Sequence, residues 1–373
     1  MRYFEKFTSN TCAASSNQLF FSTEGKICSG RTFYKISQGG EYNYSLLFSN
    51  IIDSTFADGN LSHKNLVCDE WEIHGARIGR CKFFDPSRPL CELVMRDEGE
   101  SDIEAFDFKD ITFDGKSTKR VSPGEFFSSD EQKFFFEKDE YLCLEMTFSG
   151  RMIPYHEESM LPVYVKDGDK WRYSKLMPFA GMIGCDRNVK ARVAYIGDSI
   201  TQGIGTKENA YLHWNALLSE HLGGEYAYWN LGLGYARAYD ASSDGAWLFK
   251  ARQNDVVFVC FGVNDILRGR CADKVKADLT YIVDTLKNEG ARVIVQTVPP
   301  FDYQGSFIDE WNKVNHYILN ELCDKADFVF DNTPILGKPE KLSDSLYGAH
   351  PDERGCKLWA EALYEKLKQN SVL

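Results

Sequence analysis

The feature that most constrains the fold is an alternation of apolar, β-rich runs with helical segments after about residue 185. Five such runs lie at residues 191–196, 225–230, 255–261, 291–297 and 326–330. Between the last three runs, apolar residues recur at helical spacing, first as Val275, Leu279, Ile282, Val283 and Leu286, then as Trp311, Val314, Ile318 and Leu322. Strands that alternate with helices in this way predict a doubly wound α/β fold with a parallel five-stranded sheet covered on both faces.

The first half of the sequence has the shorter period of β-strands. In residues 141–148, large apolar residues alternate with Cys143, Glu145 and Thr147, so one side of this strand should be packed and the other wet. Similar short strands are indicated at residues 103–108, 110–115 and 133–138, with a turn at Asp114-Gly115. This spacing is typical of an antiparallel, jelly-roll-like β-sandwich.

A chain of 373 residues exceeds the usual size of one hydrophobic core, which favours two domains. We expect the boundary where the period changes. The prediction is a β-sandwich domain over residues 1–185 and an α/β domain over residues 186–373.

Composition excludes several classes of partner. A net charge of -12 would repel a nucleic-acid backbone over most of the surface. The N-terminal residues lack the apolar core of a signal peptide, and no later stretch reaches the length of a membrane span. The 11 cysteines include no CxxC pair. We therefore expect a cytoplasmic protein with reduced thiols, no nucleic-acid partner and no membrane span, while its oligomeric state stays open.

Polar groups follow the ends of four predicted strands. The segments are Gly197-Asp198-Ser199, Asn230 to Gly234, Gly262 to Asp265 and, after the last strand, Gly348 to Pro351. In an open parallel sheet the ligand crevice lies beyond the carboxyl ends of the strands. These segments should therefore bring a hydroxyl, glycine backbone, a carboxamide and an imidazole to one edge.

Acyl transfer needs these groups together: a hydroxyl to attack, a base to accept its proton and fixed donors for the oxyanion. Ser199 would sit at a strand-to-helix turn, with its own N–H near the developing charge. The N–H of Gly234 and the side-chain amide of Asn264 could complete the oxyanion hole. His350 would be the base, and Pro351 suits the first turn of a closing helix.

The blocks GDSIT, NLGLG, GVND and HP, in this order, resemble those of the SGNH/GDSL hydrolase family. The resemblance covers residues 190–373 and implies a flavodoxin-like hydrolase domain without a cofactor or a metal. It also implies that Ser199 is the nucleophile, that Gly234 and Asn264 are oxyanion donors together with the Ser199 N–H, and that His350 is the base. An N-terminal β domain before such a module is similar to that of several carbohydrate esterases, which remove acetyl or other acyl groups from sugars.

The sequence departs from the family pattern at two positions. The family usually has an aspartate three residues before the histidine, where this chain has Tyr347. Asp344 could replace it, or a backbone carbonyl could orient the imidazole of a Ser-His dyad. Tyr235 stands where many members have a further glycine, and it could reshape the pocket.

Alternatives remain beside the esterase hypothesis. Asp198 is expected to fix its loop rather than take part in the chemistry, and Asn264 and Asp265 could form an ordinary Asx turn after a strand. No histidine spacing indicates a metal, and no phosphate-binding loop supports a nucleotide-dependent enzyme. The rival hypotheses are a lipase or thioesterase acting on other acyl substrates, and a carbohydrate-binding protein with a decayed active site. The expected ligand is in each case a small molecule or an oligosaccharide.

Overall fold

The computed structural model describes residues 2–55, 63–81, 105–343, 346–347 and 349–373. The chain divides into two compact units. The first falls within Met1–Ala57, His63–Asn188 and Lys207–Ala210, and the second within Val189–Thr206 and Tyr211–Leu373. The four residues Lys207–Ala210 thus belong to the first unit, although the sequence on either side of them belongs to the second.

The first unit is built from antiparallel strands, as the sequence predicts. One main sheet has the order β1-β16-β4-β10, with β11 also paired to β4; its strands are β1 (Thr8–Ser9), β16 (Met182–Cys185), β4 (Gly40–Ser49), β10 (Phe126–Ser128) and β11 (Gln132–Phe136). The other has the order β15-β14-β3-β12-β7-β8, with β9 also paired to β7; its strands are β15 (Lys170–Tyr173), β14 (Val163–Asp167), β3 (Cys28–Lys35), β12 (Tyr141–Gly150), β7 (Trp71–Cys81), β8 (Phe106–Ile111) and β9 (Lys119–Val121). The short elements are α1 (Tyr3–Lys6) and the paired strands β2 (Leu19–Phe21) with β13 (Ile153–Tyr155) and β5 (Ile51–Thr55) with β6 (His63–Val67).

Aromatic side chains link the two main sheets of this unit. Trp71 of β7 makes an edge-to-face contact with Phe127 of β10, with ring centroids 6.2 Å apart. Phe127 in turn stacks on Phe48 of β4 at 5.1 Å. All three rings are buried, so the sheets share an aromatic core.

The second unit contains a parallel five-stranded sheet of order β18-β17-β19-β20-β21. Its strands are β17 (Ala191–Gly197), β18 (Tyr226–Asn230), β19 (Val256–Cys260), β20 (Arg292–Gln296) and β21 (Phe328–Phe330). In order along the chain this is 2-1-3-4-5, the flavodoxin-like arrangement, in which strand order reverses beside the first strand. The predicted fold class is confirmed.

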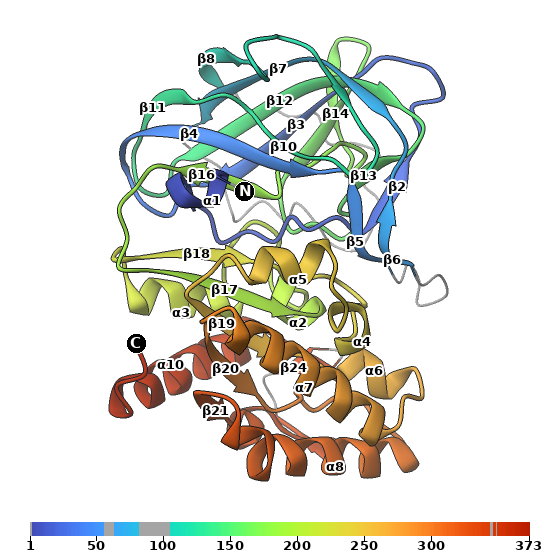
Figure 1. Ribbon diagram of the computed structural model, residues 1–373, viewed down its shortest axis with the longest axis vertical. Coiled ribbons are helices and arrows are strands. Elements are labelled where there is room, and N and C mark those ends of the chain that lie inside the picture. Colours follow the sequence, from blue (N-terminus) through green and yellow to red (C-terminus); the bar gives the residue numbers. More distant parts are fainter. Residues whose placement is uncertain (1, 56–62, 82–104, 344–345, 348) are drawn as a thin grey trace. The chain divides into compact units, whose positions relative to one another are not determined.

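Helices cover both faces of this sheet (Figure 1). They are α2 (Ser199–Gln202), α3 (Trp214–Leu222), α4 (Ala238–Ala241), α5 (Ala246–Ala251), α6 (Val263–Leu267), α7 (Ala272–Asn288), α8 (Ser306–Asn320), α9 (Thr333–Leu336) and α10 (Glu353–Gln369), and a 3-10 turn follows α8 at Leu322–Asp324. Helix α3 packs on α10, and α7 packs on α4 and α8. Right-handed crossovers place these two groups on opposite faces of the sheet. The predicted apolar residues are buried on α7 and α8, except that Leu322 lies in the 3-10 turn after α8, where it is also buried.

Two short antiparallel ribbons precede α10. One pairs β22 (Gly337–Lys338) with β23 (Lys341–Leu342), and the other pairs β24 (Leu346–Tyr347) with β25 (His350–Pro351).

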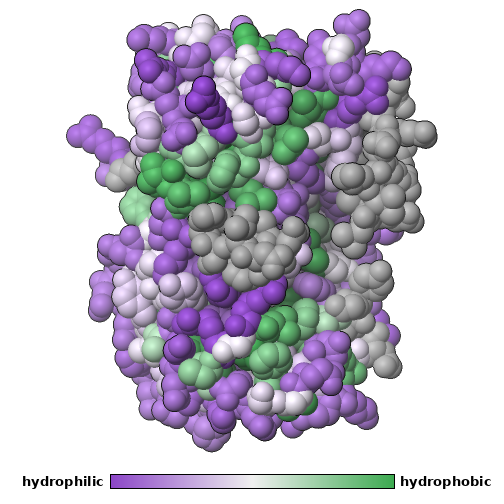
Figure 2. Space-filling view, turned by 90° about the vertical axis from the view of Figure 1, so that its right-hand side faces the viewer, coloured by the Kyte–Doolittle hydropathy of each residue, from purple (hydrophilic) through white to green (hydrophobic). Residues whose placement is uncertain are grey.

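Figure 2 shows one face of the molecule, on which hydrophobic residues form separate groups among hydrophilic ones. No helix in the described part of the chain is long and apolar enough to cross a membrane.

Candidate active site

The turn after β17 exposes Ser199 among buried neighbours. Asp198 is the N-cap of α2, and its Oδ1 accepts a hydrogen bond from the N–H of Ile200 at 3.0 Å. Ser199 is therefore the first helical residue and not the cap, so its hydroxyl is not used to close the helix. Asp198 and Ile200 are buried, whereas Ser199 is half-buried. The expected loop-fixing contact of Asp198 is present.

His350 reaches Ser199 from a distant part of the chain. The Oγ of Ser199 lies 2.9 Å from Nε2 of His350, a hydrogen bond between residues 151 positions apart. The backbone of His350 is held by pairing of β25 with β24, where His350 stands opposite Tyr347. Pro351 lies in β25 rather than in the helix, because Asp352 caps α10 by accepting the N–H of Gly355 at 2.8 Å.

Two further residues shape the surroundings of the imidazole. The ring of Phe301, in the segment after β20, meets the His350 ring edge to face with centroids 5.4 Å apart. Gly205 has a φ of 103°, and a Cβ there would lie 2.5 Å from the carbonyl oxygen of Pro351 and 2.9 Å from Cβ of His350. Only a glycine lets the backbone after α2 approach His350 so closely.

The loop after β18 packs its backbone against α2. Oδ1 of Asn230 accepts the N–H of Gly232 at 2.9 Å, and Nδ2 of Asn230 donates to the carbonyl of Thr201 at 3.1 Å. A Cβ on Gly232 would lie 2.2 Å from the backbone nitrogen of Gln202, so this position also requires glycine. The close packing brings the loop that contains Gly234 beside the turn that carries Ser199.

Tyr235 adopts a backbone conformation that suits glycine. Its φ is 58°, in the left-handed region, and it follows the buried Gly234. The family preference for glycine at this place therefore has a local physical reason, because a side chain costs free energy in this conformation. The tyrosine side chain itself is half-buried.

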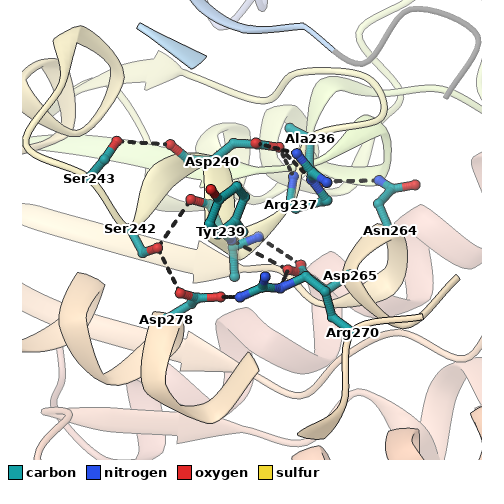
Figure 3. Close-up of polar contacts among 11 residues, drawn as sticks. Ala236, Arg237, Tyr239, Asp240, Ser242, Ser243, Asn264, Asp265, Arg270 and Asp278 are labelled. Carbon is teal, nitrogen blue, oxygen red and sulfur yellow. Dashed lines mark hydrogen bonds and ion pairs between the residues drawn. The ribbon is translucent and has the colours of Figure 1, made fainter. Parts of the chain in front are cut away.

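The turn after β19 ties Asn264 and Asp265 to the same loop (Figure 3). Asn264 is 7% exposed, and its Nδ2 donates to the carbonyl of Ala236 at 3.1 Å. Because an amide nitrogen carries two protons, this bond fixes the side chain and leaves a second N–H to donate. Oδ2 of Asp265 accepts the N–H of Ala238 at 2.7 Å, so this carboxyl group binds the start of α4 rather than closing an Asx turn of its own.

Two buried carboxyl groups lie in this region. Burial raises the pKa of Asp198 to about 7, although its hydrogen bond from Ile200 opposes the shift. Burial also raises the pKa of Asp265 to about 7, against hydrogen bonds from Ala238 and Tyr239 and the nearby Arg270 guanidinium. The low-polarity surroundings thus favour the neutral form of both groups near neutral pH.

The structure brings Ser199 and His350 together and places Gly234, Asn264 and Asp265 on one connected loop system. Of Tyr347 only the backbone is described, paired with His350, and Asp344 lies outside the described residues. Among the described residues, no group of histidine, cysteine and acidic side chains could hold a metal ion.

Sequence reasoning missed Phe301 and Gly205. Phe301 follows the fourth strand of the sheet, so the rule that active-site residues follow strand ends would have found it. Gly205 offered no such signal, because its importance comes from a contact with residues almost 150 positions away.

Comparison with known proteins gives one family match. Residues 195–358 match the model of the GDSL-like Lipase/Acylhydrolase family. No curated protein matches the chain.

Several solved structures are similar to parts or all of the chain. A family two carbohydrate esterase from Clostridium thermocellum, solved with cellohexaose, is 13% identical, with a TM-score of 0.41 over 95% of this chain and 98% of that one. A carbohydrate esterase family 3 protein from Talaromyces cellulolyticus is 21% identical, with a TM-score of 0.39 over 48% of this chain and 96% of that one. A member of the lipolytic protein G-D-S-L family from Veillonella parvula DSM 2008 is 19% identical, with a TM-score of 0.40 over 47% and 96%. The family match and the parallel sheet that carries it show that residues 195–358 form a GDSL-like lipase/acylhydrolase domain.

Proposed function

We propose that the protein is a cofactor-free carboxylic-ester hydrolase that works through an acyl-enzyme on Ser199. The observation that carries the proposal is the 2.9 Å hydrogen bond between Ser199 Oγ and His350 Nε2. A half-buried serine at the first position of a helix, paired with an imidazole, is the arrangement that nucleophilic acyl transfer requires.

In the first half of the proposed reaction, Nε2 of His350 accepts the proton of the Ser199 hydroxyl while Oγ attacks the ester carbonyl carbon. The carbonyl π electrons move to oxygen and form a tetrahedral oxyanion. We assign its stabilisation to the N–H groups of Ser199 and Gly234 and to the second Nδ2 proton of Asn264. Collapse of this intermediate breaks the bond to the alkoxy oxygen, which takes the proton from His350 and leaves as the alcohol.

The second half repeats these steps with water. His350 accepts a proton from water, the resulting hydroxide oxygen attacks the acyl carbon, and the same donors hold the second oxyanion. Ser199 then leaves with the proton from His350, which releases the acid and restores the enzyme. The edge-to-face contact between the rings of Phe301 and His350 supports a fixed orientation of the imidazole.

For the substrate we propose a short acyl group, such as acetyl, on a carbohydrate or a related small molecule. The support is the antiparallel β unit that accompanies the hydrolase domain, the arrangement that the resemblance associates with carbohydrate esterases. A lipase-type or thioesterase-type substrate is the alternative within the same chemistry.

The test is hydrolysis of p-nitrophenyl acetate, butyrate and decanoate by the wild type and by Ser199→Ala. We expect Ser199→Ala to lower kcat by roughly 10⁴-fold or more, because the nucleophile is lost. Ser306→Ala is the matched control, since Ser306 is also the first residue of a helix and is exposed. Its activity should equal that of the wild type.

The same measurements separate the alternatives. Preference for acetate, together with release of acetate from an acetylated oligosaccharide, would support the short-acyl carbohydrate substrate. Preference for decanoate would favour the lipase-type reading. Equal, near-background rates for the wild type and Ser199→Ala would reject the hydrolase and favour the carbohydrate-binding hypothesis.

A further inference from the structure

Helix α4 is held at both ends by carboxylates from other elements. At its start, Asp265 of α6 accepts the N–H of Ala238 at 2.7 Å and the N–H of Tyr239 at 3.3 Å. At its end, the hydroxyl of Ser242 donates to Asp278 of α7 at 2.9 Å. A four-residue helix has little stability of its own, so these outside acceptors fix its position.

Arg270 joins the two carboxylates, as Figure 3 shows. Its Nε lies 3.3 Å from Asp265 Oδ1, and its Nη2 donates to Asp278. Its guanidinium also lies over the ring of Tyr239, 4.5 Å from the centroid. The side chains of Arg270, Asp265 and Asp278 are only 19%, 0% and 15% exposed, so water screens these ion pairs weakly.

This cluster borders the segments that carry the proposed oxyanion donors. The loop of Gly234 leads directly into α4, and Asn264 immediately precedes Asp265 in α6. Besides the cluster, the described structure ties the two segments by the bond from Asn264 Nδ2 to the Ala236 carbonyl. The distance between the two donors therefore depends on how firmly α4 is held against α6.

We propose that Arg270 is a positioning residue that fixes the Gly234 N–H and the Asn264 amide relative to each other through Asp265 and α4. The inference rests on the proposed function, because it assigns a task to those donors. Arg270 touches neither donor. Its guanidinium lies beside the Asp265 carboxylate and opposes the rise in pKa that burial causes, so that both N–H groups at the start of α4 keep their acceptor.

The electrostatics agree with this role. Burial raises the pKa of Asp265, and the Arg270 guanidinium is the cation that opposes the rise. Without it, Asp265 would be protonated over a wider pH range and would be a weaker acceptor for Ala238 and Tyr239.

The experiment compares Arg270→Met with Arg252→Met in the full-length protein. Arg252 is the matched control, because it also bridges two carboxylates, Asp244 at 2.6 Å and Glu289 at 2.7 Å, and its side chain is 23% exposed. Amide hydrogen exchange is measured at Ala238 and Tyr239, and kcat and KM are measured with p-nitrophenyl acetate.

We expect Arg270→Met to speed exchange at Ala238 and Tyr239 by about 10-fold or more, since both amides lose a firm acceptor. Its kcat should fall by roughly 10- to 100-fold, as misplaced catalytic donors do, while KM stays within about twofold. Arg252→Met should change neither quantity. Arg270→Lys keeps the charge but not the forked donor geometry, and should fall between Arg270→Met and the wild type.

A double variant tests whether Arg270 acts through the donors. In an Asn264→Ala background, Arg270→Met should reduce kcat much less than it does in the wild type. If Arg270→Met lowers kcat by the same factor in the Asn264→Ala background as in the wild type, the proposal is wrong. If Arg270→Met does not fold, Asp278→Asn removes one of the two anchors of Arg270 and takes its place in the comparison.

The remaining outcomes are distinct. If hydrolysis depends on Ser199 but Arg270→Met leaves kcat or the amide exchange rates unchanged, this inference alone is wrong. Equal hydrolysis by the wild type and Ser199→Ala overturns the proposed function and the inference together.

Discussion

Asp198 and Ser199 divide two tasks that one residue could not perform. The carboxylate of Asp198 caps α2, and the neighbouring hydroxyl is left to contact His350. The cap stabilises the turn by about 1 kcal/mol in typical helices, but here the capping carboxyl group is fully buried. Its second oxygen, Oδ2, makes no hydrogen bond within the described residues. The buried, partly unsatisfied carboxyl group of Asp198 therefore lowers the stability of the folded state.

The buried Asp198 carboxyl predicts a pH dependence of stability. The pKa is about 7 in the folded protein and 3.8 in the unfolded chain. Between these values the folded state keeps the proton and the unfolded state loses it, so this group makes the free energy of unfolding fall as pH rises from about 4 to about 7. Asp198→Asn keeps the bond to Ile200 and cannot ionise. Its stability should therefore fall less between pH 5 and 7, by up to about 1.4 kcal/mol per pH unit.

Urea unfolding at pH 5, 6 and 7 checks this prediction. Asp352→Asn is a suitable control, because Asp352 is also a helix N-cap but is only half-buried. Parallel pH profiles for the wild type and Asp198→Asn would show that the Asp198 carboxyl is charged throughout this range.

Gly205 gives a second prediction at the residue scale. Gly205→Ala puts a methyl group 2.5 Å from the Pro351 carbonyl oxygen and should push His350 away from Ser199. Gly290→Ala is the matched control, with a similarly positive φ of 87° but no atom within 4 Å of the added carbon. Both variants should lose about 1 kcal/mol of stability from backbone strain. We expect kcat/KM to fall about 100-fold in Gly205→Ala alone, measured with p-nitrophenyl acetate.

The sequence predicted residues that follow strand ends and failed to predict residues that act through contacts. Ser199, Asn264 and His350 were predicted because each lies in a block that follows a strand or precedes a helix, in the order that the resemblance implies. Gly205 and Arg270 were not found. Their importance depends on which distant backbone or carboxylate lies beside them, and no local pattern contains that information.

At the scale of elements, α10 positions the segment that carries His350. Trp359 of α10 stacks on Trp214 of α3, with centroids 5.0 Å apart, and its Nε1 donates to Gln296 of β20 at 2.8 Å. Trp359→Ala should therefore cost about 3–5 kcal/mol of unfolding free energy. The adjacent Leu358 is 43% exposed, and Leu358→Ala should cost less than about 0.5 kcal/mol. Equilibrium denaturation of both variants measures the difference; similar costs would contradict the assigned packing.

Strand β12 shows where alternation misleads. The pattern of residues 141–148 predicts a wet face at Cys143, but Cys143 is fully buried. Phe33 stands opposite it on β3, and Phe108 covers Gly79, its partner on β7. A period-2 pattern predicts which residues share a face of the strand. It does not predict whether large side chains of neighbouring strands bury the residues on the other face.

At the scale of the whole chain, a short stretch between α2 and α3 belongs to the first unit. Glu208 pairs with Lys175 and accepts a hydrogen bond from the Tyr173 hydroxyl at 3.0 Å, and the N–H of Asn209 donates to the Met160 carbonyl at 2.8 Å. The change of period near residue 185 did not predict that Lys207–Ala210 belong to the first unit. Four residues are too few to form a pattern of their own.

The ion pair of this stretch gives a prediction for the first unit. The side chains of Lys175 and Glu208 are 14% and 3% exposed. Lys175→Met leaves a buried carboxylate without its cation and should cost about 3–5 kcal/mol. The exposed pair of Lys6 and Glu131 is the control, and Lys6→Met should cost less than about 1 kcal/mol. Thermal unfolding reports both values. Glu208→Gln is then added to Lys175→Met. If Lys175→Met costs little stability and the added Glu208→Gln does not change that cost, the pair is not buried in solution.

The placement of Lys207–Ala210 also affects how the protein emerges during translation. The first unit cannot complete its contacts when residue 188 has been made, because its last four residues follow later in the message. At about 5–20 residues per second the nascent chain waits roughly 1–4 s for them. During that interval Lys175 lacks its partner Glu208, so the first unit completes its contacts only after synthesis of the second unit has begun.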